Sequence, residues 1–116
     1  MESINRTIQS FDNSRVALES AMLECIEKGL DEFGSTFKFV VFFEIKKSEH
    51  ISEKMLVSKP LTFSNVLDRM FGAGSVSIKK TIIQRLSERF GVSANEQDLV
   101  SMIHQIVARF EGTVNN

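Results

Sequence analysis

Apolar side chains recur every three or four residues along most of this 116-residue chain, the spacing that places them on one face of an α-helix. Three such runs close on phenylalanine followed by glycine, at Phe33-Gly34, Phe71-Gly72 and Phe90-Gly91. Glycine most readily takes the left-handed conformation needed just after a helix. The pattern therefore predicts helices that end in glycine turns, each with an aromatic side chain at its last core contact.

The first and last predicted helices have clear apolar stripes. The first extends from Ser14, with the stripe Leu18, Met22, Cys25, Ile26, Gly29, Leu30 and Phe33. The last follows Ser93 and Glu96, whose S-x-x-E spacing is that of a capping box. Its stripe is Leu99, Met102, Ile103, Ile106, Val107 and Phe110, and Gly112 follows.

Between them, residues 61–90 read as a helix hairpin. A loop at 48–60, with a short helical turn near 51–56, ends at the only proline, Pro60, which is acceptable in a first helical turn. The two stripes are Phe63, Val66, Leu67, Met70 and Phe71, then Val76, Ile78, Ile82, Ile83, Leu86 and Phe90.

The run FKFVVFFEI, within residues 37–48, is ambiguous. Its apolar residues alternate as in a strand, but they also form a near-continuous apolar segment, and periodicity alone does not decide between strand and helix. A lone strand would find no partner of similar character elsewhere in the chain. We therefore predict a buried helix, central to the fold and covered on most sides, and keep the strand as the alternative.

Composition supports one folded domain. Hydrophobic residues make up 42% and charged residues 25%, near the averages for globular proteins. We expect an all-α, compact bundle of about five helices, with residues 1–12 flexible or loosely helical, 13–112 a single helical domain and 113–116 a tail.

Composition also bears on compartment and partners. The chain has one cysteine and no apolar segment near the roughly 20 residues of a membrane span, so we expect a cytoplasmic protein with no membrane partner. A net charge of −1 gives no global attraction to nucleic acid or to an anionic membrane. A local basic face remains compatible with that balance.

The stretch from Ala17 to Val92 resembles a small helical domain of ammonia-oxidising archaea, the Nitrosopumilus output domain family. The resemblance rests on the Phe33-Gly34-Ser35 turn, the aromatic-rich second helix, the Pro60 start and the segment FSNVLDRMFGAGSVSIKKTIIQRLSERFGV. It implies a helical output module of archaeal signalling proteins. The family has no established biochemical activity, so no site residues transfer. No receiver-sized segment precedes Ala17, so we expect the module to act alone or with partners in trans.

The hairpin carries the two candidate ligand sites. Its second helix would expose a polar face like that of a DNA-recognition helix, with Lys79, Lys80, Arg85 and Arg89 as the nucleic-acid-binding residues. The turn places Gly72, Gly74 and Ser75 at a helix N-terminus, where an anion could bind. The phosphate-loop pattern is incomplete, however, and a C-cap followed by an N-cap explains the motif fully.

Histidine and cysteine chemistry points to no catalytic or metal site. His50 and His104 lie far apart with no ligand spacing around them. We expect His50 in a solvated loop, His104 at the boundary of the core, and Cys25 as a small core residue. No cofactor is implied.

The ten phenylalanines, without tryptophan or tyrosine, favour apolar packing. If Phe39, Phe42 and Phe43 are not all covered within one chain, the remainder would form an exposed patch and favour a homodimer. The sequence thus predicts a non-enzymatic protein-interaction or signalling-output module with an unknown protein partner. The alternative is a helix–turn–helix nucleic-acid-binding regulator that uses residues 61–90.

Overall fold

The computed structural model describes the backbone of residues 2–95 and 98–115 and the side chains of 14–95 and 98–110. These residues form five α-helices, two short 3-10 helices and no strand. The helices are α1 (Glu2–Asp31), α2 (Phe37–Glu49), η1 (Glu53–Met55), α3 (Pro60–Phe71), η2 (Gly72–Gly74), α4 (Ser75–Phe90) and α5 (Leu99–Asn115). The predicted all-α class is confirmed.

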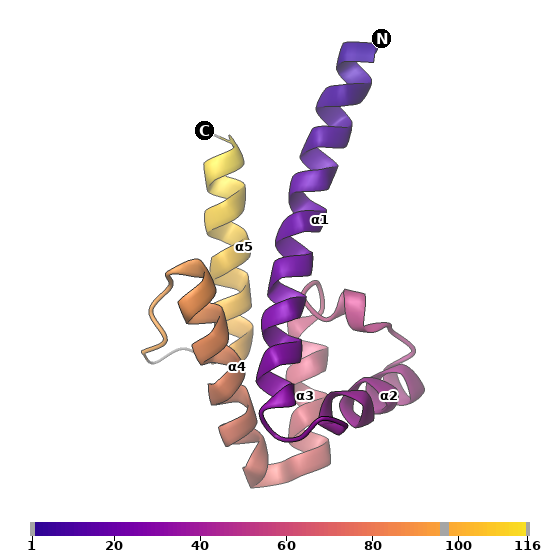
Figure 1. The fold of residues 1–116 in the computed structure, drawn as a ribbon, viewed down its shortest axis with the longest axis vertical. Coiled ribbons are helices and arrows are strands. Elements are labelled where there is room, and N and C mark those ends of the chain that lie inside the picture. The colour runs from indigo at the N-terminus through magenta and orange to yellow at the C-terminus, as the bar shows by residue number, and fades with distance from the viewer. Residues whose placement is uncertain (1, 96–97, 116) are drawn as a thin grey trace.

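Four of the helices are roughly aligned. In Figure 1, α1 and α3 run downward, α4 and α5 run upward, and α2 crosses the lower part of the bundle at one side. The upper parts of α1 and α5 extend beyond the other helices, so both ends of the chain lie at the same end of the molecule. Helix α1 is continuous from Glu2, well before the stripe that begins after Ser14, and α5 continues through Gly112.

The core lies mainly between α1 and α4, with α3 and α5 packed against α4 from other sides. Its fully buried side chains include Met22, Ile26, Leu30, Phe63, Leu67, Ile82, Leu86, Leu99, Met102 and Ile103. Gly29 allows α1 and α4 to approach closely, because a Cβ there would lie 2.9 Å from Ile82 Cγ1 and 3.2 Å from its Cα.

Two of the three predicted Phe-Gly helix ends are present, because α3 ends at Phe71 and α4 at Phe90. Helix α1 ends earlier, at Asp31, and Phe33-Gly34 lies in the turn that follows it. The glycine of each pair has a positive φ. The aromatic residues before them are less buried than predicted. Phe33 is exposed, and its ring packs 5.5 Å from that of Phe37, which stacks in turn on Phe71 at 5.1 Å. Val76, placed in the stripe of the fourth helix, is also exposed.

Helix α2 settles the strand-or-helix ambiguity in favour of the helix, but the prediction of a central, covered element is wrong. Only Val41 and Ile45 of its side chains are buried, and the helix lies at the side of the bundle (Figure 1). An apolar run that surrounds a helix gives no period from which to tell the inner face from the outer one.

Ser93 does not cap α5, contrary to its part in the predicted capping box. Ser93 Oγ accepts a hydrogen bond from the backbone N–H of Asn95 at 3.2 Å, inside the loop, and Glu96 lies outside the described residues. Helix α5 begins at Leu99, and Asp98 Oδ1 accepts from the N–H of Ser101 at 2.7 Å. This bond lowers the pKa of Asp98 and makes Asp98 the N-cap.

No helix in the described part of the chain is both long enough and apolar enough to cross a membrane.

Candidate interaction surfaces

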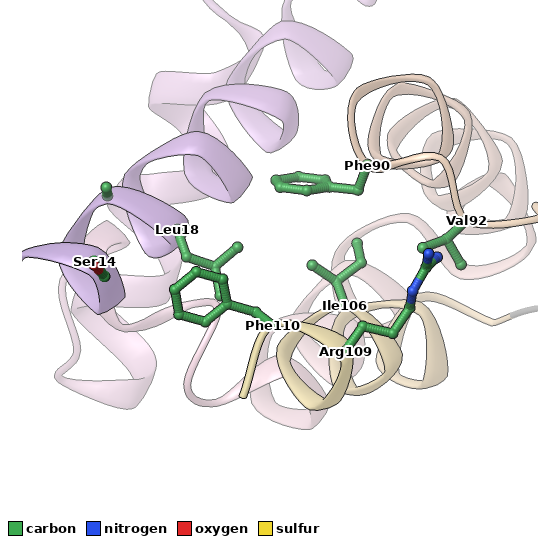
Figure 2. Close-up of a pocket in the computed structure, with 8 residues that line it drawn as sticks. Ser14, Leu18, Phe90, Val92, Ile106, Arg109 and Phe110 are labelled. Carbon is green, nitrogen blue, oxygen red and sulfur yellow. The ribbon is translucent and has the colours of Figure 1, made fainter. Parts of the chain in front are cut away.

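An open apolar groove lies between α1 and α5 at the end of the molecule that carries the chain termini. It encloses about 500 Å³ and is lined by Ser14, Ala17, Leu18, Phe90, Val92, Ile106, Arg109 and Phe110. Figure 2 shows Leu18, Phe90, Ile106 and Phe110 pointing toward the shared space. In the described part of the chain, the backbones of α1 and α5 do not approach each other closely. Both helices instead pack on α4, and the groove remains where α4 ends.

The polar residues of the groove lie at its margins. Arg109 extends past Val92 at one side, and its guanidinium donates to the carbonyl oxygen of Gly91 at 3.5 Å. Ser14 and Ala17 have small side chains and form the α1 wall beside Leu18. A concave apolar surface with few polar groups is typical of a binding site for an apolar ligand or an amphipathic helix.

A second surface is formed by what we term the α2 outer face, comprising Phe39, Val40, Phe43, Lys46 and Lys47. The exposed fractions of Phe39, Val40 and Phe43 are 62%, 54% and 69%. Phe42, which was grouped with the other two phenylalanines, is half-buried against the core. Phe39 and Phe43 are therefore not covered within one chain, and they form the exposed patch that was expected in that case.

The four cations predicted for nucleic-acid binding do not form a continuous basic stripe. Lys79 Nζ donates to Asp68 Oδ1 at 2.7 Å, Arg85 Nε to Glu32 Oε2 at 2.8 Å, and Arg89 Nη1 to Glu24 Oε1 at 3.4 Å. These bonds tie α4 to α3, to α1 and to the turn that follows α1. They lower the pKa of Asp68 and, together with Lys28 as the main cause, that of Glu24.

The remaining cation, Lys80, is exposed on α4. It borders a shallow polar depression together with Glu32, Thr81, Gln84, Arg85 and Glu88. Two carboxylates stand among its polar groups, so the charge of this face is mixed.

The glycine turn that was considered for anion binding already holds a carboxylate of the same chain. Ser75 is buried at the start of α4, and its Oγ donates to Asp68 Oδ1 at 2.6 Å, the atom that also accepts from Lys79. Gly72 and Gly74 form the 3-10 turn before it. Asp68 thus stands where a bound anion would stand, at the positive end of the α4 dipole.

The histidines and the cysteine lie apart from one another. His50 is exposed at the C-cap of α2. His104 is exposed on α5, not at the core boundary as predicted, because it falls between the buried positions Ile103 and Ile106 on the outward side of the helix. Cys25 is buried in the core as predicted, and burial raises the pKa of its thiol. The described residues contain no group of three histidine, cysteine or acidic side chains that could hold a metal ion.

Half of the residues that line the groove were predicted from the sequence as core contacts, namely Leu18, Phe90, Ile106 and Phe110. The helical period shows that Leu18, Ile106 and Phe110 belong to inward faces; it does not show whether a facing helix reaches them. Asp68 had no local signal either, since its partners Ser75 and Lys79 come from the next helix.

No protein-family model, no curated protein and no solved structure matches this chain.

Proposed function

We propose that this protein is a non-enzymatic protein-interaction module of the cytoplasm, and that the groove between α1 and α5 receives an apolar helical segment of a partner protein. A signalling-output role of the archaeal type, as the sequence resemblance implies, is part of the proposal. The observation that carries it is the groove itself, which presents four apolar side chains from three segments to one open space.

The size and chemistry of the groove support a helix as the ligand. Peptide helices bind in apolar grooves through side chains spaced three and four residues apart, and Leu18, Ile106 and Phe110 line both long walls. A homodimer is one form of the same proposal, in which the helical segment comes from a second copy of the chain.

The nucleic-acid alternative has less support. Three of its four cations are bonded to carboxylates of α1, α3 or the turn after α1, and electrostatic contact with phosphates requires cations that are available to displace counterions.

Site-specific photo-crosslinking tests the proposal. A photoreactive amino acid replaces Ala17, an exposed residue of the α1 wall, and the cells are irradiated. We expect a covalent adduct with a discrete protein, and its loss when Phe110→Asp is added, because a charge in the groove opposes apolar binding. An adduct of twice the mass of the chain identifies a second copy.

The matched control places the photoreactive residue at Asn65, which is exposed on α3 away from the groove. Equal crosslinking at both positions, or an adduct indifferent to Phe110→Asp in a variant that keeps its helical circular dichroism, would contradict the proposal. Fluorescence anisotropy of labelled duplex DNA at two salt concentrations tests the alternative. Salt-sensitive binding that is lost in Lys80→Ala and Arg85→Ala would favour the nucleic-acid-binding regulator.

A further inference from the structure

The α2 outer face is a single stripe along the helix. Phe39, Val40, Phe43, Lys46 and Lys47 follow the spacing i, i+1, i+4, i+7 and i+8, so they lie on one side of the 13-residue helix. The opposite side carries Val41 and Ile45, which anchor the helix to the core. The stripe is therefore held outward by the packing of α2 and is not an accident of side-chain rotation.

The charge of this stripe has one sign. The side chains of Lys46 and Lys47 are exposed and have no hydrogen-bond or ion-pair partner among the described residues. The two acidic residues of α2 lie on its flanks, where Glu44 is half-buried and Glu49 is paired with Arg69 at 3.4 Å. Lys38 adds a cation beside Phe39, with its Nζ 5.3 Å from the ring centre, while it is paired with Asp31.

We propose that the α2 outer face binds the surface of an anionic lipid bilayer, with α2 lying parallel to the membrane plane. Phe39, Val40 and Phe43 enter the boundary between headgroups and acyl chains, and Lys46 and Lys47 contact headgroup phosphates. The contact would combine the two attractions that hold peripheral proteins at an anionic surface, the burial of apolar side chains at the headgroup boundary and the attraction of lysines to anionic lipids. At 13 residues α2 is too short to span a bilayer.

The same observations argue against two other ligands of this face, a second copy of the chain and a different protein. A second copy would bring the lysines of both chains to one interface with no carboxylate on either outer face to pair with them. A protein partner would have to supply a concave apolar surface, because the three side chains protrude from a convex helix. A bilayer accepts such side chains without a preformed pocket. The overall charge balance, from which no membrane partner was expected, does not describe this local face.

The chain has no tryptophan or tyrosine, so Phe43→Trp introduces a single fluorophore at the centre of the stripe. With vesicles of phosphatidylcholine and phosphatidylglycerol, we expect a blue shift of its emission and quenching by brominated acyl chains. Vesicles of phosphatidylcholine alone should give neither, and added salt should weaken the binding. Flotation of the wild-type protein with vesicles measures its partitioning onto the membrane without the tryptophan reporter.

Two substitutions separate the contributions of apolar burial and of lysine charge to vesicle binding. Phe39→Ser should weaken flotation by about tenfold or more, and Lys46→Gln by roughly fivefold. The controls are Leu61→Ser, an equally exposed apolar residue of α3, and Lys80→Gln, the exposed lysine of α4, and both should bind as the wild type does. Absence of wild-type binding to the anionic vesicles, or equal losses in the controls, would overturn the proposal. A blue shift of Phe43→Trp without lipid, together with a dimer in sedimentation velocity, would assign the face to a second copy.

Discussion

Gly29 determines how closely α1 and α4 can pack. Gly29→Ala should lower the free energy of unfolding by about 1–3 kcal/mol, the usual cost of overpacking, although alanine favours a helix by about 1 kcal/mol. The clash involves the backbone Cα of Ile82 as well as its flexible side chain. Urea denaturation measures the change. In the control Gly74→Ala, the new Cβ would meet only Phe71 Cβ at 3.8 Å, and stability should not fall. A Gly29→Ala protein more stable than wild type would show that the two helices separate at no cost.

Asp68 should make stability depend on pH at the α3–α4 corner. Hydrogen bonds from Lys79 and Ser75 lower its pKa from an ordinary value of 3.8, so the folded state favours the ionised form. The contribution of the Asp68 carboxylate to the free energy of unfolding is present above pH 3.8 and is lost as the pH falls through the lower pKa of the folded state. Because the side chain is half exposed, Asp68→Asn should cost below about 1 kcal/mol near neutral pH.

Thermal unfolding of the two proteins at a series of pH values checks this expectation. The gap between their midpoints should narrow once the pH drops below 4 and the wild-type carboxyl is protonated. A gap that is constant down to pH 2 would mean that the carboxylate charge contributes nothing.

At the scale of elements, α2 combines a stabilising face with one that stability does not require. Ile45→Ala should cost about 2–5 kcal/mol because it leaves a cavity in the core. Phe43→Ala, two residues away on the α2 outer face, should change stability by no more than about 0.5 kcal/mol. Denaturant midpoints compare the two variants directly. A large loss in Phe43→Ala would place Phe43 in an interface that the folded monomer does not contain.

The start of α5 depends on Asp98. Asp98→Ala removes the acceptor for the N–H of Ser101 and should lower stability by about 0.5–2 kcal/mol. Ser93→Ala serves as the control, because the Ser93 hydroxyl accepts a hydrogen bond only inside the loop, and its loss should be smaller. Equal losses of stability in the two variants would indicate that Ser93 is part of the helix cap.

The elements were predictable to different degrees, for physical reasons. Helices α3 and α4 carry their own boundary signals, Pro60 at one end and Gly72 and Gly91 at the others, and their bounds follow the sequence closely. Helix α2 has apolar residues all round, so the helix could be predicted but its outer face could not. The start of α5 was missed because a chance S-x-x-E spacing lay ahead of the true cap. The groove depends on which helix ends first, and that is a property of packing.

At the scale of the whole molecule, Cys25 should report unfolding. Its side chain is buried and its thiol pKa is raised, so few thiolates are available to react. We expect a thiol reagent to modify the folded protein slowly and the denatured protein at once. The rate should rise in Gly29→Ala, which loosens the helix pair beside Cys25. Rapid modification of the native wild type would indicate that α1 and α4 open locally without global unfolding.

Both ends of the chain lie at the end of the molecule that holds the groove (Figure 1). A segment joined to either terminus by a short flexible tether would be present at the groove at an effective concentration on the order of millimolar. Even a weakly binding helix, if covalently attached, would then exclude a free competitor at micromolar concentration. Tethering, cleavage or extension at the termini would therefore control access to the groove without changing any residue that lines it.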